Sequence, residues 1–311
     1  MSEQVNSNIA MFADGLACPL KIVCWNIANA KRDNDYHPLL DRIPDVIATL
    51  LDISPDVFIW LEAGRDCVSE SGDVVTFTEI AVRVQKETGL RYAGIDMLNA
   101  TASPFGKAVF YNPQTTFVNK HAQQWTTDNS EIPSGDAYGN SMTTVIVYPV
   151  VKGRVVIDSS VSVCAVHLPM KRSARMQVCK FLTETARVNN RMTDIIIGDM
   201  NTFPDDGASD MISVLEEHFT EALPADTAMT FHAYSHDKVT VQNNMLHTMP
   251  LAEIVSTGET ESVVIPVSWL DHCMVDRDYQ GAVTASVYLN VIGSPSDHYP
   301  IIACVNANTN P

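Results

Sequence analysis

The sequence predicts an α/β (α+β) fold, a sandwich built on mixed β-sheets with helices packed against them. Short apolar runs of the buried-strand type alternate along the chain with amphipathic helical patterns, which is typical of sheets covered by helices. Some predicted strands follow one another without a helix between them, which indicates antiparallel, hairpin-like pairs and therefore mixed sheets. The 311 residues contain no repeat, low-complexity tract or dividing linker, so we expect a single domain over residues 21–306. Residues 1–20 are expected to form a lead-in and residues 307–311 a tail.

The first half of the chain alternates buried strands with two helices. Lys21–Ile27 is a run of buried-strand type, and Leu39–Leu51 has apolar residues near helical spacing before a Ser-Pro-Asp turn. Val57–Leu61 is predicted to be a second buried strand. Phe77–Thr88 has a helical pattern and is followed by a glycine, the residue that commonly ends a helix. Further strands are expected at Tyr92–Asp96, Lys107–Tyr111 and Thr143–Val151.

The second half continues the alternation. Val161–Leu168 is predicted to be a strand, and Arg172–Asn189 a long amphipathic helix. Asp194–Gly198 is a short apolar strand, and Ser209–Phe219 is predicted to be a helix. Closing strands are expected at Trp269–Val275, Val283–Leu289 and Tyr299–Val305, and long loops, which often have a function, at Asn112–Asn140 and His232–Pro266.

The composition narrows the class of protein. The formal net charge is −17, so the overall field does not attract nucleic acid, although a bound cation and a local basic rim can reverse the potential at a site. No stretch reaches the ~18 apolar residues of a membrane span, and the first residues lack the pattern of a signal peptide. The seven cysteines are scattered without a CxxC pair, which indicates reduced structural thiols, no zinc site and an intracellular (cytoplasmic) location.

Polar side chains follow several of the predicted buried strands at the point where each strand ends. Catalytic groups are often held on such ends by a rigid scaffold. Carboxylate and amide oxygens suit Mg²⁺, and Mn²⁺ accepts the same ligands, so Asn26, Glu62 and Asp297 are candidate ligands of a metal ion. Taken singly, each of these residues is more often a turn residue or a solvated strand end. Their joint occurrence is what supports a site.

The remaining polar strand ends predict the chemistry. Asp199 is a candidate to take a proton from an attacking water molecule, and Asn201 to hold water or phosphate. His167 and His298 are candidates to donate to a phosphoryl oxygen as negative charge builds up. Asp271 is expected to orient His298 and keep it protonated, as a neighbouring carboxylate does.

Short motifs containing these residues follow one another in a specific order. Ile197–Thr202 is similar to the pattern GDFNT, and Ser296–Pro300 matches SDHxP. The others lie at Cys24–Ile27, Pro55–Glu62, Gly106–Tyr111, Val166–Leu168 and Leu270–His272. In this order the chain resembles the endonuclease/exonuclease/phosphatase superfamily, which has the deoxyribonuclease I-like fold, over nearly its whole length.

The resemblance implies a four-layer sandwich of two packed mixed β-sheets flanked by helices. It also implies metal-dependent hydrolysis of a P–O bond by in-line attack of activated water, with the roles already given to the polar strand ends. Two residues depart from the family pattern. Leu61 stands where a glutamine usually supports the metal-binding glutamate, and His272 stands where an aromatic residue is usual. His272 is expected to be a polar surface residue, with a contact to substrate as the alternative.

The sequence predicts the class of substrate less directly than it predicts the fold and the chemistry. A nucleic acid or nucleotide is favoured, and a small or lipid-linked phosphate, of the inositol phosphate or sphingomyelin type, is the alternative. A catalytically inactive binding module is disfavoured because every core polar residue is present. Phe231 and His232 resemble an element near the mouth of the site in some family members, although Phe231 suits a core position equally well. Basic residues expected to contact phosphate around the mouth are Lys31, Arg32, Lys107, Lys171, Arg172 and Arg175.

Overall fold

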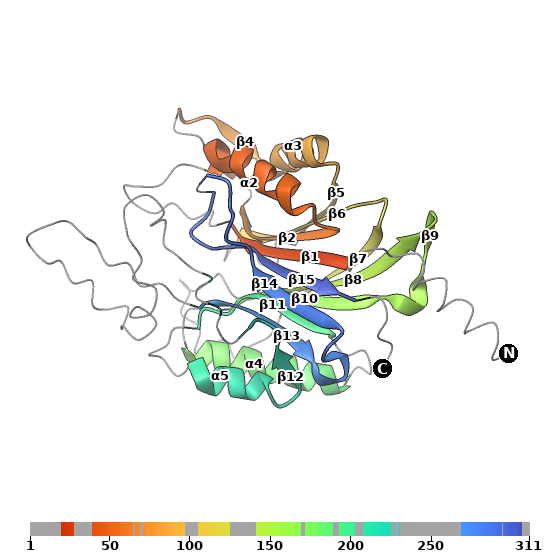
Figure 1. Ribbon diagram of the computed structural model, residues 1–311. Helices are drawn as coiled ribbons and strands as arrows, with labels where there is room; N and C mark the ends of the chain where they lie inside the picture. The colour runs from red at the N-terminus through yellow and green to blue at the C-terminus, as the bar shows by residue number, and fades with distance from the viewer. Residues whose placement is uncertain are drawn as a thin grey trace, which may run out of the picture.

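Two mixed β-sheets lie face to face at the centre of the molecule, and helices cover the outer face of each (Figure 1). The layers therefore run helix, sheet, sheet, helix, which confirms the sandwich expected from the sequence. The computed structural model describes residues 20–27, 39–64, 66–68, 71–96, 105–124, 141–168, 172–188, 193–202, 208–224, 227, 230, 269–293 and 295–306.

The first sheet is built around the parallel pair β1 (Leu20–Asn26) and β2 (Val57–Gly64), which helix α2 (Leu39–Ile53) connects. Its strand order is β14-β15-β1-β2-β6-β5, and the other neighbours in it are antiparallel. Because the connection crosses over, β1 and β2 end at the same edge of the sheet. The remaining strands are β5 (Arg91–Asp96), β6 (Phe105–Tyr111), β14 (Val283–Val287) and β15 (Ile301–Val305).

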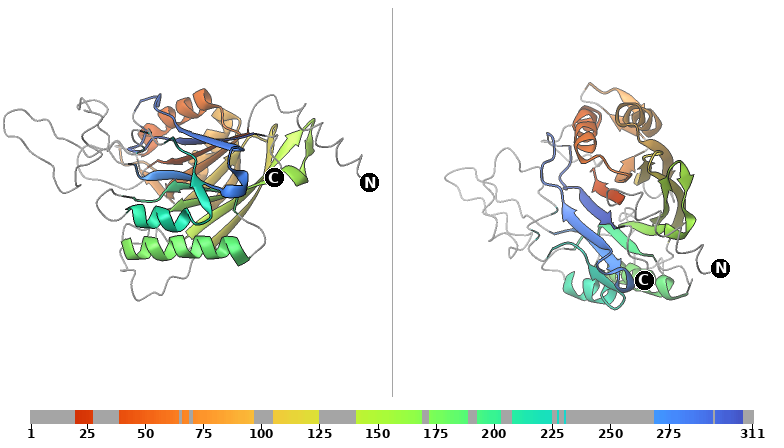
Figure 2. Two further views of the ribbon diagram at one scale, coloured as in Figure 1. Left: turned by 60° about the horizontal axis from the view of Figure 1, so that its bottom comes forward. Right: turned by 45° about the vertical axis from the view of Figure 1, so that its right-hand side comes forward.

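The second sheet repeats this plan. Its parallel pair is β10 (Val161–His167) and β11 (Ile195–Asp199), connected by helix α4 (Arg172–Val188), within the order β12-β13-β11-β10-β8-β7. Figure 2 shows α4 and α5 on one side of the sandwich and α2 on the other. The remaining elements are β7 (Thr116–Gln124), β8 (Ser141–Val151), β9 (Arg154–Val155), α5 (Ala208–Leu215), β12 (Phe219–Glu221) and β13 (Asp271–Asp276).

Helix α3 (Phe77–Thr88) has the bounds predicted from the sequence, and its caps explain them. The Thr76 hydroxyl accepts a hydrogen bond from the Glu79 amide, and the Glu79 carboxylate accepts one from the Thr76 amide at 2.8 Å. Gly89 follows with φ 77°, a left-handed conformation that glycine adopts at little cost. The short elements outside the sheets are β3 (Asp66–Val68), β4 (Val74–Thr76), and the 3₁₀ helices η2 (Ile157–Ser159) and η6 (Arg277–Tyr279).

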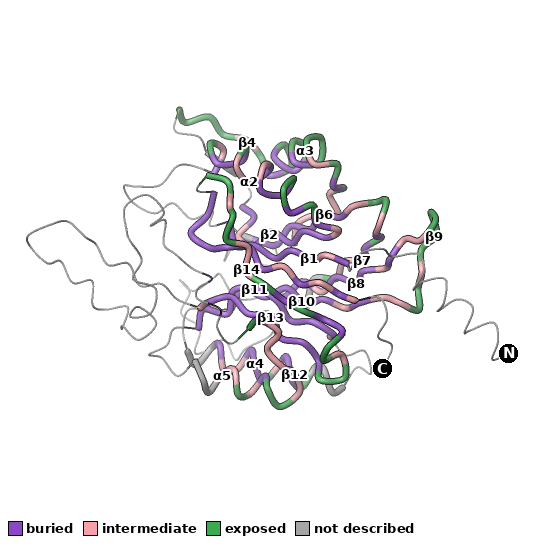
Figure 3. Tube along the Cα trace, in the orientation of Figure 1, coloured by how far each residue is buried: buried purple, intermediate pink, exposed green. Residues whose placement is uncertain are grey.

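Successive side chains of a strand point to opposite faces of its sheet, and in the central strands both faces are apolar. In β1, Cys24 packs between the sheets, whereas Trp25 packs against α2. In β11, Ile197 packs between the sheets, whereas Ile196 packs in the cluster under α4 and α5. A strand buried on both faces needs apolar residues at successive positions, which explains the continuous apolar runs of the sequence. Figure 3 shows these buried strands at the centre of the molecule.

Two differences from the prediction have a clear physical reason. The stretch 112–140, predicted to be a long loop, contains strand β7. This strand lies at the edge of the second sheet, where Phe117 points outward and is 47% exposed and Val118 points inward and is 8% exposed. Because an edge strand carries many polar residues, its sequence does not show the apolar pattern of a buried strand. The helix predicted over 209–219 ends at Leu215, because Phe219 opens strand β12. The predicted loop 232–266 lies outside the described residues.

The helices and the cysteines bear on two further predictions. In the part of the chain that the structure describes, no helix combines the length and apolar character that crossing a membrane requires. The cysteines with described side chains are free thiols, as the scattered spacing predicted: Cys24, Cys164, Cys179, Cys273 and Cys304.

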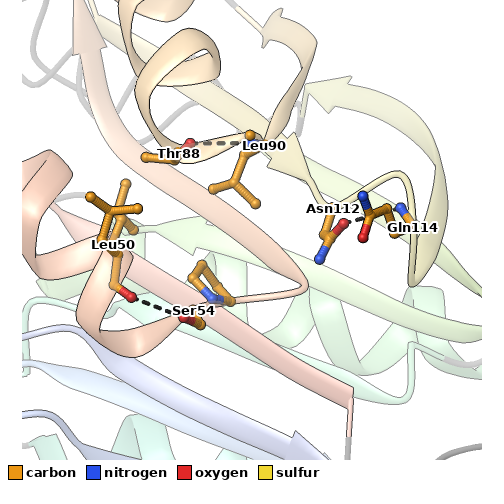
Figure 4. Close-up of a pocket in the computed structure, with 9 residues that line it drawn as sticks. Leu50, Ser54, Thr88, Leu90, Asn112 and Gln114 are labelled. Atoms are coloured by element: carbon orange, nitrogen blue, oxygen red, sulfur yellow. Dashed lines mark hydrogen bonds between the residues drawn. The ribbon is translucent and has the colours of Figure 1, made fainter.

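A pocket of about 230 Å³ lies where α2 and α3 end, beside the start of β2 (Figure 4). Its polar backbone groups are satisfied by local turns: the Ser54 amide donates to the Leu50 carbonyl at 2.8 Å, and the Leu90 amide donates to the Thr88 hydroxyl at 3.2 Å. The length of β2, roughly 20 Å, separates this pocket from the edge where the polar strand ends gather.

Candidate active site

The polar residues predicted from the strand ends meet at one edge of the sandwich. The parallel pairs place Asn26 at the end of β1 and His167 beside Asp199 at the ends of β10 and β11. Asp199 also pairs in register with Asp271, the first residue of β13. Four strands of two sheets therefore deliver their side chains to the same place, as expected where parallel strands end.

Asn26 links the two sheets inside this site. Its side chain is 1% exposed, and Nδ2 donates to Oε1 of Glu62 at 3.2 Å and to Oδ2 of Asp199 at 3.0 Å. Glu62 has φ 61°, and the register between β2 and β6 shifts at this point. A glutamate rarely adopts the left-handed region, so the strand holds Glu62 in a strained conformation. The bulge turns the carboxylate toward Asn26.

The turn after β11 positions Asp199 and Asn201. Gly198 has φ 138°, and a Cβ there would overlap the carbonyl oxygen of Val166, so this position requires glycine. Oδ1 of Asp199 accepts from the Asn201 amide at 2.9 Å, and Nδ2 of Asn201 donates to the Leu168 carbonyl at 2.7 Å. Asp199 is 2% exposed, and this burial raises its pKa, although the two nearby histidines act in the opposite direction.

The two histidines flank Asp199. Nδ1 of His298 lies 2.8 Å from Oδ2 of Asp271, and Nε2 lies 3.7 Å from Oδ2 of Asp199. Burial alone would lower the pKa of His298, but the carboxylates of Asp271, Asp199 and Asp297 together raise it to about 10. Nε2 of His167 lies 3.6 Å from Oδ2 of Asp199. His298 is therefore an imidazolium at neutral pH.

The segment that carries Asp297 and His298 is tied to the end of β1. Trp25 Nε1 donates to the His298 carbonyl at 2.8 Å, and the Ser296 hydroxyl donates to the Asn26 carbonyl. Arg42 of α2 is 3% exposed and donates from Nη1 to the carbonyls of residues 27 and 295. Sequence reasoning missed Arg42. Its signal was a basic residue on the apolar stripe of a predicted helix, beside Leu39 and Ile43.

The acidic residues of the site fit a hard cation. Among the described residues, one group of three offers ligand atoms within 4.8 Å of one another, namely Asp199, Asp271 and His298. This group differs from the predicted set of Asn26, Glu62 and Asp297. Because His298 is already bonded to Asp271, we favour the predicted set, whose amide and carboxylate oxygens are the ligands that Mg²⁺ prefers. Oδ1 of Asp297 lies 3.9 Å from Nε2 of His298, so the predicted ligand borders the same site.

Several predicted contacts of the site mouth lie outside the described residues. These are Lys31, Arg32, Lys171, Phe231 and His232; Arg172 opens α4, but its side chain is not described.

Three other side chains are buried, and for His272 this contradicts the expected surface position. Lys107 is 3% exposed; it lies on β6 opposite Leu61 and faces the interior between the sheets. Burial lowers the pKa of Lys107 to about 8. Arg175 is fully buried on α4, where Nε lies 3.3 Å from Sδ of Met211. His272, expected at the surface, is 6% exposed and hydrogen-bonded through both ring nitrogens.

No protein-family model and no curated protein matches the chain. Solved structures do. An endonuclease/exonuclease/phosphatase family protein from Bacteroides thetaiotaomicron is 16% identical, with a TM-score of 0.56 over 91% of this chain and 96% of that one. The mannosyl-6-phosphatase Bt3783 of the same species is 16% identical, with a TM-score of 0.55 over 91% and 98%. D. rerio TDP2 complexed with a single-strand DNA product is 14% identical, with a TM-score of 0.54 over 92% and 98%. The chain thus has the fold of endonuclease/exonuclease/phosphatase proteins, which confirms the fold expected from the motifs.

Proposed function

We propose that this protein is a metal-dependent phosphoesterase that hydrolyses a P–O bond by in-line attack of water. The observation that carries the proposal is the meeting of Glu62 and Asp199 at the side-chain amide of Asn26, with His298 beside Asp199. Successive contacts of 3.2, 3.0 and 3.7 Å join Glu62 to Asn26, Asn26 to Asp199, and Asp199 to His298. Glu62, Asp199 and His298 come from three separate segments and from both sheets. Buried carboxylates and imidazoles gathered in this way are costly to stability, so they point to chemistry.

The metal ion, Mg²⁺ or Mn²⁺, would be held by oxygen atoms of Asn26, Glu62 and Asp297. When bound, it supplies positive charge that polarises a phosphoryl oxygen. The strained backbone of Glu62 supports this assignment, because such conformations persist where a side chain must be aimed at a defined point.

Asp199 acts as the general base. Its burial raises the affinity of the carboxylate for a proton, which makes it a better acceptor than an exposed aspartate. One proton of the attacking water passes to Asp199 while the water oxygen bonds to phosphorus. The bond from phosphorus to the leaving oxygen breaks on the opposite side, and that oxygen leaves with the electron pair and takes up a proton from solvent. Asn201, anchored to the Leu168 carbonyl, holds the phosphate beside Asp199.

His298 and His167 stabilise the charge that develops on phosphorus. The imidazolium of His298 keeps Nδ1 on Asp271 and directs Nε2 toward the space beside Asp199, where the phosphoryl group would lie. His167 approaches the same carboxylate from β10. A pre-oriented donor of this kind stabilises the transition state more than the substrate, which raises kcat.

We favour a nucleic acid or nucleotide as substrate. The structural likeness to TDP2, which was solved with a single-strand DNA product, supports this choice. A small or lipid-linked phosphate is the second candidate. The net charge of −17 and the burial of Lys107 and Arg175 favour it, because they leave less positive charge for a long polyanion. The likeness to a mannosyl-6-phosphatase agrees with this alternative. The free thiols fit a reducing intracellular compartment.

A hydrolysis panel tests the proposal. The purified protein is given DNA, RNA, nucleotides, sugar phosphates, inositol phosphates and sphingomyelin, with Mg²⁺, Mn²⁺ or a chelator. Glu62→Gln keeps the size of the side chain and removes its charge, while Glu87→Gln does the same at an exposed position of α3. We expect hydrolysis that needs metal, is lost in Glu62→Gln and is retained in Glu87→Gln. Equal activity in both variants would overturn the metal assignment.

A further inference from the structure

A hydrogen-bonded network lies directly behind the candidate site, on the outer face of the second sheet. Along β13, Asp271 faces the site, and the next residue, His272, points to the opposite face. Nε2 of His272 lies 2.7 Å from Oγ1 of Thr202, and Nδ1 lies 2.7 Å from Oε2 of Glu221. His272 thus connects the turn after β11 with strand β12.

The imidazole of His272 is held from several sides. Oε1 of Glu221 accepts from the amides of Leu223 at 3.0 Å and Cys273 at 3.1 Å, which fixes the carboxylate that holds Nδ1. The indole of Trp269 stacks on the imidazole, with ring centroids 5.3 Å apart and an interplanar angle of 13°. A ring with both nitrogens engaged and one face covered has a single orientation.

Thr202 is the point at which this network reaches the candidate site. Its hydroxyl donates to the Trp269 carbonyl at 2.8 Å, and the same oxygen lies 2.7 Å from Nε2 of His272. Two residues earlier, the Met200 amide donates to the Leu270 carbonyl at 2.8 Å. These bonds fasten the turn that carries Asp199 and Asn201 to the start of β13.

We propose that His272, oriented by Glu221, is a positioning residue that fixes Thr202 and thereby sets the placement of Asp199 and Asn201 relative to Asp271. The inference rests on the proposed function, because it assigns these residues to the reaction. A carboxylate and an amide that must meet a water molecule and a phosphate tolerate little displacement. A shift of about 1 Å in such groups can lower the rate by about 100-fold.

Histidine is suited to this task in a way that a purely apolar ring is not. A phenylalanine at position 272 would fill the same space and stack on Trp269, but it would remove the bond to the Thr202 hydroxyl. It would also leave Oε2 of the half-buried Glu221 beside an apolar ring without its partner, which costs stability. The polar atoms of His272 therefore provide a directional link in addition to packing.

The experiment tests separately the two hydrogen bonds that the ring nitrogens of His272 make. Glutamine places an amide nitrogen near the position of Nε2, whereas asparagine places one near Nδ1. We therefore compare His272→Gln, which can keep the bond to Thr202, with His272→Asn, which can keep the bond to Glu221. His272→Phe and Thr202→Val each remove the bond to Thr202. The readout is kcat and KM with Mg²⁺ on bis(p-nitrophenyl) phosphate and p-nitrophenyl phosphate.

We expect His272→Phe and Thr202→Val each to lower kcat about tenfold or more, with KM changed by less than about threefold. The double variant should be no slower than the slower single variant, because both changes break one link. His272→Gln should retain more activity than His272→Asn. Wild-type kcat in His272→Phe, or equal kcat in the glutamine and asparagine variants, would overturn the inference.

A second readout needs neither activity nor metal. In metal-free protein, the amides of Met200 and Asn201 should exchange with deuterium faster in His272→Phe and Thr202→Val than in wild type, because the turn is released from β13. Unchanged exchange at these amides also overturns the inference. If the wild-type protein hydrolyses neither probe nor any substrate of the panel, the proposed function fails, and the exchange measurement still tests the link between His272 and the turn.

Discussion

Nδ1 of His298 lies 2.8 Å from Oδ2 of Asp271, and this pair joins the two sheets. Asp271 opens β13 of the second sheet, whereas His298 precedes β15 of the first. The imidazolium and its counter-ion are therefore brought together only when the sheets are packed.

The activity should depend on pH through this pair. The pKa of His298 is raised from 6.5 to about 10, so its proton contributes to folding fully below pH 6.5 and ceases to do so as pH rises through about 10. We expect kcat/KM to fall above that pH. In Asp271→Asn the alkaline limb should move to lower pH, because a major charge that holds the proton is gone. A pH profile of both proteins checks this, and coincident alkaline limbs would contradict it.

The strain at Glu62 makes a prediction about stability. Glu62 has φ 61°, a conformation that costs a residue with a Cβ about 1 kcal/mol and costs glycine little. Glu62→Gly should therefore have a free energy of unfolding about 1 kcal/mol higher than Glu62→Ala, while neither variant retains metal-dependent hydrolysis. Urea denaturation measures the difference. An alanine variant as stable as the glycine variant would mean that the backbone relaxes at this position.

The turn after Gly198 should tolerate no side chain. A Cβ at Gly198 would overlap the Val166 carbonyl oxygen, and φ there is 138°. We expect Gly198→Ala to lower the free energy of unfolding by more than about 3 kcal/mol. Gly281→Ala is the matched control, because φ is 89° but no atom lies within 4 Å of the added carbon. That control should cost about 1 kcal/mol. If thermal denaturation gave equal losses in the free energy of unfolding for the two variants, the positive φ alone would decide the cost and the overlap with Val166 would not.

Arg42 should be needed for both stability and rate. Its guanidinium donates to the carbonyl of Ile27, which follows β1, and to that of Pro295, two residues before Asp297. Arg42→Met keeps the apolar length and should lower the free energy of unfolding by about 2–3 kcal/mol, together with kcat. Arg42→Lys should rescue poorly, since an ammonium is a point donor and lacks the planar fork. Wild-type stability and kcat in Arg42→Lys would mean that a positive charge at this position is sufficient and the two donors of the guanidinium are not needed.

The site could be predicted because its residues follow strands with strong apolar patterns. Asn26, Glu62 and Asp199 each come at the end of a continuous buried run, and parallel strands end together. The helix over Phe77–Thr88 was predicted with its bounds because its caps are local. Local signals and short-range patterns are what a single sequence carries most directly.

The supporting residues could not be predicted in the same way. Lys107 and His272 look like surface residues in the sequence, and only the pairing of distant strands shows that they are buried. Strand β7 was missed because an edge strand buries few of its side chains. Burial of a polar group depends on what packs against it, and this information is spread over segments far apart in the chain.

The pairing of β1 with both β2 and β15 has a consequence for biosynthesis. Leu20 pairs with Val305, so the strand that carries Asn26 receives one neighbour early and the other from the last described strand. Contacts of such high sequence separation form late and close a very long loop. A chain still emerging from the ribosome would contain Glu62 and Asp199 but lack His298 in its place. On the proposed function, the polypeptide should therefore be inert toward phosphoesters until its synthesis has passed β15, because only then can His298 join Asp199.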